Sequence, residues 1–157
     1  MRIGHSKDVH QLVGGRPLIL GGVTIDHEKG LFGHSDADVL IHVVCEAIIG
    51  ALGLGDIGAH FPDTDAAYKN IDSRVLLRKV RELLQDSEYQ IANLDATIFA
   101  EAPKMRPHID SMCANIADDL KIEQNQVNVK ATRGEGMGFI GRKEGMAAEC
   151  VVLLVKG

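Results

Sequence analysis

The amino-acid sequence predicts one α+β domain in which helices pack on one face of a mixed β-sheet. Its 157 residues suit a single domain with a single hydrophobic core. Short apolar segments of β character alternate with three segments of helical spacing, in the order strands, helix, helix, strand, helix, strand, strand. Helices on one face leave the other face of the sheet to be covered, and an oligomeric partner is the simplest cover.

The strands are predicted from runs of β-branched and apolar residues that end at turns. A Gly21-Gly22 turn separates two short strands, and an extended segment with Asp8-Val9-His10 precedes them. The closing strand is apolar almost throughout, which is typical of a buried central strand. Strands are therefore expected over residues 18–20, 23–25, 91–99, 127–132 and 147–155.

Three helices are predicted from apolar residues that recur at helical spacing. The first is expected from about Asp36 to Leu52, with Ser35 and Asp38 resembling a capping box at its start. The second is expected over residues 73–84, and the third begins near Pro107, which suits a first helical turn. The apolar stripe of the first helix consists of Leu40, Val43, Val44, Ala47, Ile48, Ala51 and Leu52.

Composition and charge argue against several classes of protein. The formal net charge of −5 disfavours non-specific nucleic-acid binding, which requires a basic surface. No apolar run approaches the roughly 20 residues that span a bilayer, and the first residues lack the apolar core of a signal peptide. Cys45, Cys113 and Cys150 are odd in number and far apart, so we expect no disulfide framework, no membrane and a reducing, cytoplasmic setting.

Asp8, His10 and His42 form a candidate metal site. Residues two apart on a strand point to the same side, so Asp8 and His10 face one direction. On the first helix His42 lies outside the apolar stripe, and one carboxylate with two imidazoles is a typical zinc set with an open fourth position. Two alternatives stay open: these can be ordinary surface side chains, or Cys45 can complete a four-ligand structural site instead of lying in the core.

The segment from Thr132 to Arg142 is rich in glycine, hydroxyl and basic groups, so its backbone N–H groups could bind phosphate. Gly136, Gly138 and Gly141 match G-x-G-x-x-G, but a strand follows them rather than a helix, which excludes a dinucleotide fold. A flexible hairpin loop is the alternative interpretation.

Three further segments are turn-rich and polar: residues 56–65 with their carboxylates, residues 100–106 with two cations, and His34-Ser35 before the first helix, where anions are favoured. Taken singly, each of these segments is consistent with a solvated loop.

Many such segments occur in a fixed order along the chain. They are Asp8-Val9-His10, Gly21-Gly22-Val23, His34-Ser35-Asp36-Ala37-Asp38 with His42, Gly55-Asp56-Ile57-Gly58, Phe61-Pro62-Asp63-Thr64-Asp65, Ala102-Pro103-Lys104-Met105, Asn128-Val129-Lys130-Ala131-Thr132, Glu135, Gly138-Phe139 and Gly141-Arg142. With these motifs the chain resembles, from end to end, the 2-C-methyl-D-erythritol 2,4-cyclodiphosphate synthase family of the non-mevalonate isoprenoid pathway.

The resemblance implies a phosphorus-oxygen lyase. Such an enzyme converts 4-diphosphocytidyl-2-C-methyl-D-erythritol 2-phosphate, a cytidine diphosphate-linked substrate, to the 2,4-cyclodiphosphate and releases CMP. It also implies a homotrimer with active sites between neighbouring subunits. Zinc would be held by the residues matching Asp8, His10 and His42. A second divalent cation, magnesium or manganese, would be held by Glu135 with the substrate phosphates.

The same resemblance implies the residues that meet the substrate. Asp56 and Gly58 would meet the ribose, residues 100–105 with 131–132 the cytosine, and His34-Ser35 with residues 61–65 the erythritol. Catalytic roles would fall to His34, Arg133 and Glu135. The substrate-binding set is Asp8, His10, His34, Ser35, Asp56, Ile57, Gly58, Phe61, Pro62, Asp63, Thr64, Asp65, Ala100, Ala102, Pro103, Lys104, Met105, Arg106, Ala131, Thr132, Arg133, Gly134, Glu135, Phe139 and Arg142.

The chain departs from the family pattern at two places. Lys7 stands where the family usually has an aromatic or apolar residue, and Arg133 and Gly134 stand where it usually has threonines, the first of which is a transition-state contact. Two other functions are kept as alternatives: a non-catalytic metal-binding trimer, and a different metal phosphohydrolase that uses a metal-bound water. Intact Ala102-Pro103-Lys104-Met105 and Glu135 favour the synthase.

Overall fold

A computed structural model describes residues 1–157 and contains a five-stranded mixed sheet with the strand order β4-β1-β7-β5-β6. The closing strand is central, as its apolar sequence predicted: it pairs antiparallel with β1 on one side and with β5 on the other. β5 and β6 are parallel, so the sheet is mixed. The strands are β1 (Arg2–Gly14), β4 (Lys29–Leu31), β5 (Tyr89–Phe99), β6 (Val127–Thr132) and β7 (Gly145–Lys156).

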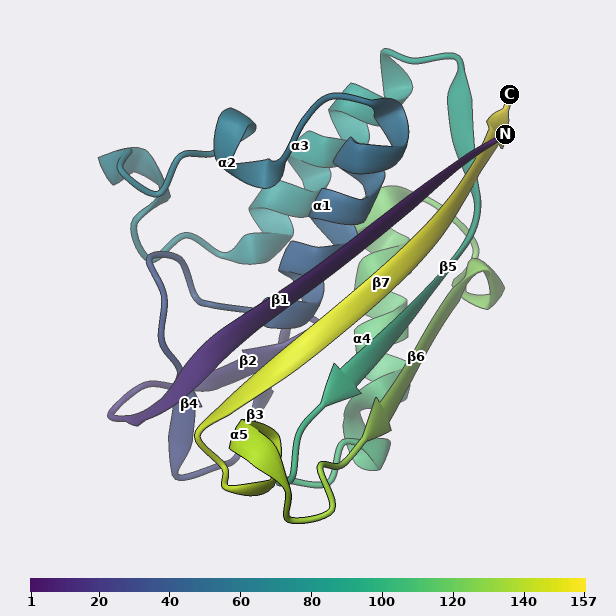
Figure 1. The fold of residues 1–157 in the computed structure, drawn as a ribbon. Coiled ribbons are helices and arrows are strands. Elements are labelled where there is room, and N and C mark those ends of the chain that lie inside the picture. Colours follow the sequence, from purple (N-terminus) through teal and green to yellow (C-terminus); the bar gives the residue numbers. More distant parts are fainter.

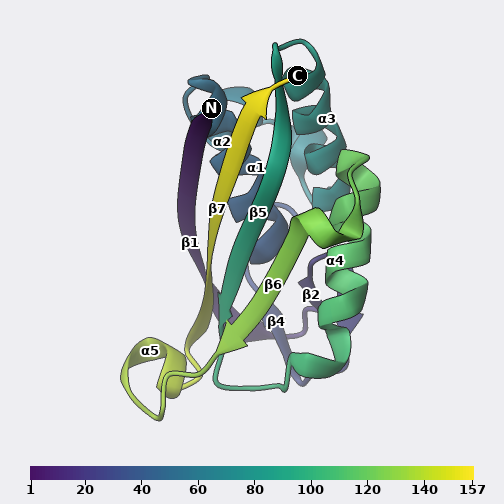
Figure 2. The same ribbon diagram turned by 90° about the vertical axis from the view of Figure 1, so that its right-hand side faces the viewer.

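The three main helices lie on one face of this sheet, which confirms the predicted α+β layering (Figures 1 and 2). They are α1 (Val39–Leu52), α3 (Ser73–Gln85) and α4 (Arg106–Leu120). α1 packs against β1 and β7, and α3 packs against α1. Pro107 lies in the first turn of α4, as expected. No helix has both the length and the apolarity needed to cross a membrane.

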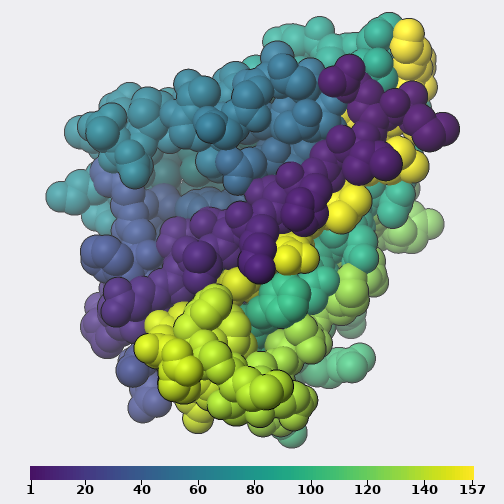
Figure 3. All heavy atoms as spheres, viewed as in Figure 1, coloured from purple at the N-terminus to yellow at the C-terminus, as the bar shows by residue number.

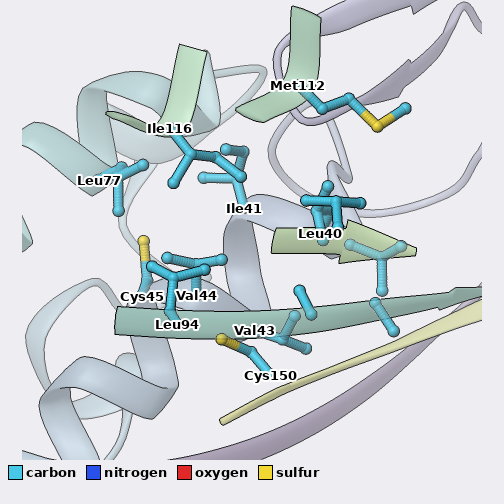
Figure 4. Packing of buried hydrophobic residues seen from close by; sticks show 14 of the residues in the cluster. Leu40, Ile41, Val43, Val44, Cys45, Leu77, Leu94, Met112, Ile116 and Cys150 are labelled. Carbon is cyan, nitrogen blue, oxygen red and sulfur yellow. The ribbon is translucent and has the colours of Figure 1, made fainter. Parts of the chain in front are cut away.

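Helix α1 is buried more completely than its sequence pattern predicted. Ile41, Cys45 and Ile49 lie outside the expected stripe, yet each is fully buried. Figure 4 shows side chains of α1 together with Leu77 of α3 and Ile116 of α4 in one apolar cluster. A helix that is apolar on nearly all sides is typical of such a central position. His42 and Glu46 are the polar side chains of this helix, and both are only partly buried.

The predicted capping box at the start of α1 is wrong, because Asp38 is the N-cap and the helix begins at Val39 rather than near Asp36. The Asp38 carboxylate accepts hydrogen bonds from the backbone N–H groups of Ile41, Gly21 and Gly22. Burial raises the pKa of Asp38 to about 6, although these N–H groups favour its charged form. One buried carboxylate thus joins the start of α1 to the glycine turn.

That turn links β2 (Leu18–Leu20) to β3 (Val23–Ile25), with the bounds that the sequence predicted. Gly21 and Gly22 both have positive φ, 58° and 72°, as a two-residue hairpin turn requires. Several short elements were not predicted: β4, α2 (Ile57–His60), α5 (Gly138–Gly141), and 3₁₀ turns at Ala66–Tyr68 and Gln124–Gln126.

The other face of the sheet is open, and Figure 3 shows β1 and β7 running across it. Side chains on this face alternate with those that point to the helices. Ile3, Val9 and Val151 are apolar and 72%, 52% and 47% exposed. Lys7 is also on the open side and lies 3.6 Å from the Glu149 carboxylate, so it points away from Asp8 and His10, as strand parity predicted.

Strand β1 and helix α1 are in direct backbone contact at Gly4. A Cβ atom at position 4 would lie 1.8 Å from the Ala47 carbonyl oxygen, so no side chain fits between the two elements. This contact holds the second half of α1 against the start of β1, while His42 in the first turn of α1 lies opposite Asp8 and His10.

Candidate functional site

Asp8, His10 and His42 meet where β1 faces the start of α1, as the sequence predicted. Their ligand atoms all lie within 4.8 Å of one another. The Asp8 Oδ2 atom is 2.9 Å from His10 Nε2 and 3.6 Å from His42 Nδ1. All three side chains are partly buried, with the two imidazoles 17% and 16% exposed. The residues thus form a compact three-ligand group that opens toward solvent.

The remaining nitrogen of each imidazole is held by the surrounding chain. His10 Nδ1 lies 2.9 Å from the Phe32 carbonyl oxygen, which fixes that nitrogen as the donor. His42 Nε2 lies 3.1 Å from both the Ser35 and the Ser73 hydroxyl oxygens. His10 Nε2 and His42 Nδ1 are therefore left to face Asp8. Donation by the outer nitrogen of a histidine is the usual support of a metal ligand.

The electrostatics of the group favour a cation. Burial raises the pKa of Asp8, but the adjacent His10 and His42 imidazoles outweigh this effect and hold that pKa well below its usual range. Burial lowers the pKa of His10, but the hydrogen bond to Asp8 raises it by more, so the pKa lies above its usual value. One ionised carboxylate and two imidazoles with an open side match a zinc site that keeps a free position. Cys45 is not a fourth ligand, because it lies in the core outside this group.

A cavity of about 400 Å³ opens beside the metal group. It is lined in part by apolar side chains, including Tyr68, Ile71 and Leu76, which sequence reasoning did not identify. The predicted site residues in its wall are His10, His34, Ser35, His42, Ile57, Gly58, Phe61, Pro62 and Asp63. The residues assigned to the erythritol side are therefore gathered largely around the metal group.

Asp56, Thr64 and Asp65 belong to the same segment but do not line the cavity. The Asp56 carboxylate caps α2 by accepting the Ala59 N–H at 2.9 Å. The Asp65 carboxylate caps the following 3₁₀ turn. The backbone carbonyl oxygen of Asp65 lies 3.1 Å from His34 Nε2. These carboxylates therefore stabilise the short helical turns that carry cavity residues such as Ile57, Gly58 and Tyr68.

A second cavity, of about 740 Å³, lies where the parallel strands β5 and β6 end. Its wall contains residues 100–106, where the chain enters α4, Ile109 and Asp110 of α4, and residues 128–133 along β6. The predicted residues Ala100, Ala102, Pro103, Lys104, Met105, Arg106, Ala131, Thr132 and Arg133 all belong to it. Both strands end at this edge of the sheet, which explains why segments about 30 residues apart meet here.

Glu101 organises the outer edge of the second cavity. Its carboxylate lies 3.1 Å from the Arg133 guanidinium and accepts the Gly134 N–H at 2.9 Å. Burial raises the pKa of Glu101, but the hydrogen bonds from the Gly134 N–H and Arg133 lower it by more, so the pKa lies below its usual value. Sequence reasoning did not identify this pair, because only the register of β5 with β6 brings the residues together.

Glu135, Phe139 and Arg142 lie outside both cavities, in an exposed loop with the short helix α5 that projects beyond the sheet (Figure 2). Phe139 is 41% exposed. Arg142 is paired with Glu144 at 2.8 Å. The two cavities have no lining residue in common, so a single chain does not gather all predicted residues into one site.

Comparisons with known proteins agree over almost the whole chain. A family model described as the YgbB family matches residues 1–155. The 2-C-methyl-D-erythritol 2,4-cyclodiphosphate synthase of Thiobacillus denitrificans is 60% identical over 157 residues, covering 100% of this chain and 98% of the relative.

Two solved structures are also similar. The bifunctional IspDF of Campylobacter jejuni has a TM-score of 0.95 at 43% identity; the match covers 99% of this chain and 42% of that longer one. The IspF of Plasmodium falciparum in its CDP complex has a TM-score of 0.87 at 33% identity, with 99% and 96% covered.

Proposed function

This chain belongs to the YgbB family, and we propose that it carries out the family reaction at a metal held by Asp8, His10 and His42. The reaction is the cyclisation of 4-diphosphocytidyl-2-C-methyl-D-erythritol 2-phosphate to 2-C-methyl-D-erythritol 2,4-cyclodiphosphate. The enzyme is a lyase that releases CMP in the non-mevalonate route to isoprenoids. The convergence of the three ligands beside a cavity carries the metal assignment.

The reaction does not require a strong base from the protein. An oxygen of the 2-phosphate forms a bond to the diphosphate phosphorus that is attached to the methylerythritol. The bond from that phosphorus to the bridging oxygen breaks, and this oxygen leaves with CMP. The attacking phosphate is already ionised at neutral pH, so no strong base is needed. The barrier comes from repulsion between anions and from orientation, which donors and cations in a fixed site reduce.

Zinc fits the three ligands, and when bound it would supply a Lewis acid and an orienting contact for a phosphate oxygen. The chain would hold a second divalent cation, magnesium or manganese, through Glu135. His34 and Ser35 border the metal group and would orient the erythritol phosphate end with residues 61–65. Asp56 and Gly58 would meet the ribose.

Residues 100–106 and 131–132 would hold the cytosine end in the second cavity. This cavity is bounded by β6, by the segment that follows β5 and by the start of α4. Arg133 would present a guanidinium to the diphosphate, where the family pattern has a threonine hydroxyl. In the single chain that guanidinium is paired with Glu101, and substrate phosphate would compete for it.

We further infer a homotrimer in which the metal cavity of one subunit meets the second cavity of its neighbour. Two observations support this assembly. The open face of the sheet carries exposed apolar side chains at Ile3, Val9 and Val151. The two cavities are also lined by separate residues of one chain, so a substrate that needs both requires a second copy.

Product analysis tests the reaction, with His42→Ala testing the metal assignment. The wild-type enzyme should release CMP and the cyclic diphosphate in equal amounts. A metal phosphohydrolase would give open-chain phosphates instead, and a non-catalytic trimer would give no product. His42→Ala should lose zinc and reduce turnover about 10³-fold or more, because metal charge stabilisation contributes several kcal/mol. Full zinc occupancy in the folded variant would contradict the ligand set.

A further inference from the structure

The Ser73 hydroxyl lies behind His42, on the side away from the metal group. Its oxygen is 3.1 Å from His42 Nε2, and the residue is fully buried. Ser73 is the first residue of α3, yet the cap of that helix is Asp72, whose side chain accepts the Arg74 N–H. The Ser73 hydroxyl therefore does not cap α3 and lies within hydrogen-bond distance of the His42 imidazole.

The Asp36 carboxylate fixes the direction of the hydrogen bonds around Ser73. It accepts the Ser73 hydroxyl proton on one oxygen and the Ser73 N–H, at 3.0 Å, on the other. An ionised carboxylate can only accept, so the Ser73 hydroxyl must donate to it. A hydroxyl that has given its only proton to Asp36 can only accept from His42 Nε2. His42 must then carry its proton on Nε2.

We propose that Asp36 and Ser73 are positioning residues that hold His42 in the tautomer and orientation needed for metal binding. With the proton on Nε2, the lone pair of Nδ1 faces the Asp8 carboxylate, which is 3.6 Å away. The relay extends the common pairing of a metal-bound histidine with a carboxylate through one serine. This inference rests on the proposed metal site, and it ties that site to the first turn of α3.

The Ser35 hydroxyl does not replace Ser73 in this role. It is also 3.1 Å from His42 Nε2, but it accepts the Ala37 N–H and is not within hydrogen-bond distance of a carboxylate. Its own proton is free to turn toward either the imidazole or the cavity. Ser35 alone is therefore compatible with both tautomers of His42, and the Asp36–Ser73 pair decides between them.

The test compares Ser73→Ala with Ser6→Ala in zinc-free protein. Ser6 is a matched control, because it is also buried and donates to a carboxylate, that of Glu46 at 2.8 Å, away from the metal group. Zinc affinity is measured by competition with a coloured chelator. Loss of an outer-shell partner weakens metal binding about 10- to 100-fold, so Ser73→Ala should fall in that range and Ser6→Ala should match wild type. Ser73→Thr keeps the hydroxyl and should retain most of the affinity.

The zinc dependence of turnover distinguishes the relay from a general loss of packing, because added zinc would not restore a disrupted core. Turnover of Ser73→Ala should recover when zinc is raised by the same factor by which its affinity fell. Nitrogen NMR of the wild-type zinc-free protein, at a pH where its imidazoles are neutral, should show His42 protonated on Nε2. This spectrum needs no variant, so the inference stays testable if Ser73→Ala fails to fold.

The outcomes separate this inference from the proposed function. If wild-type protein does not bind zinc, the metal assignment itself is wrong. If wild type binds zinc but Ser73→Ala binds it equally well, or if neutral His42 carries its proton on Nδ1, the relay is wrong while the metal site stands. An equal loss of affinity in Ser6→Ala would assign the effect to packing and also reject the relay.

Discussion

The metal cavity and the second cavity are built in different ways. In the metal cavity, functional side chains come from β1 and α1, and hydrogen bonds with Phe32, Ser35 and Ser73 hold the two imidazoles. The second cavity is lined by β6, by the segment after β5 and by the start of α4, and long, flexible cations such as Lys104 and Arg133 are among its lining residues. A metal requires ligands fixed within tenths of an ångström, whereas an anion can be met by a side chain that moves. One half of the site is therefore preorganised in each chain, and we infer that assembly completes the other.

Separating the subunits is the strongest test of this division. Val151→Glu places a charge on the open sheet face, while Gln85→Glu adds the same charge on α3 as a control. Burying an unpaired carboxylate costs several kcal/mol, so Val151→Glu should dissociate the trimer and lower turnover at least about 100-fold. Zinc affinity per chain should be unchanged, because the metal ligands all come from one chain. Light scattering should report three times the 17.0 kDa chain for wild type and for the control.

A monomeric Val151→Glu protein with full activity would contradict a site shared between subunits. A monomer that has also lost zinc would contradict the claim that each chain preorganises its own metal site.

Arg133 tests the more adaptable half of the site. If its guanidinium contacts the diphosphate as charge develops, Arg133→Ala should lower turnover more than substrate binding. A charge-assisted contact contributes about 1.5–3 kcal/mol, which is roughly ten- to a hundred-fold in rate. Arg133→Thr restores the hydroxyl of the family pattern and should recover part of the loss. Kinetics at saturating substrate and metal measure the effect.

If Arg133→Ala matches wild type in both turnover and Michaelis constant, the guanidinium does not contact substrate. Its partner Glu101 would then hold the loop through the Gly134 N–H alone.

Lys7 gives the smallest expected effect and tests whether the two sides of β1 are independent. We infer that Lys7 and Arg142 lie toward the axis of the proposed trimer, where three copies of each cation would repel one another unless anions offset them. Glu149 and Glu144 already pair with these cations in the chain. Lys7→Phe should therefore stabilise the assembly at low phosphate by no more than about 1 kcal/mol per chain, the scale of an exposed ion pair, and Tm should rise slightly. Zinc affinity should stay the same.

Melting curves with and without phosphate measure this effect. Equal melting temperatures under both conditions, in wild type and in Lys7→Phe, would show that no bound phosphate offsets these cations.

Local chemistry made part of the structure predictable. The Gly21-Gly22 turn fixed the bounds of β2 and β3, because only that turn joins two strands so tightly. The metal group followed from strand parity at Asp8 and His10 together with the position of His42 off the apolar stripe. In each case neighbours within one element determine the geometry.

Features that depend on packing between elements were not predictable in this way. Ser35 was interpreted as a cap, but its hydroxyl faces His42, and Asp38 caps α1 instead. The Asp36–Ser73 contact joins residues separated by 37 positions, and the Glu101–Arg133 pair depends on the register of β5 with β6. Hydrophobic periodicity carries no information about such contacts. The same limit explains why the sequence alone did not divide the site residues between two cavities.

The contact at Gly4 has a consequence for how the metal site can change over time. Most cores tolerate exchange of one apolar side chain for another because neighbouring elements shift slightly. Here α1 rests on the backbone of β1, with the Ala47 carbonyl oxygen where a side chain at position 4 would begin. The spacing between α1 and β1 at Gly4, which lies beside the metal group along the same two elements, is thus set by main-chain contact rather than by side-chain volume. Substitutions in the apolar interior should therefore shift α1 relative to β1 less than they would if side chains alone separated the two elements.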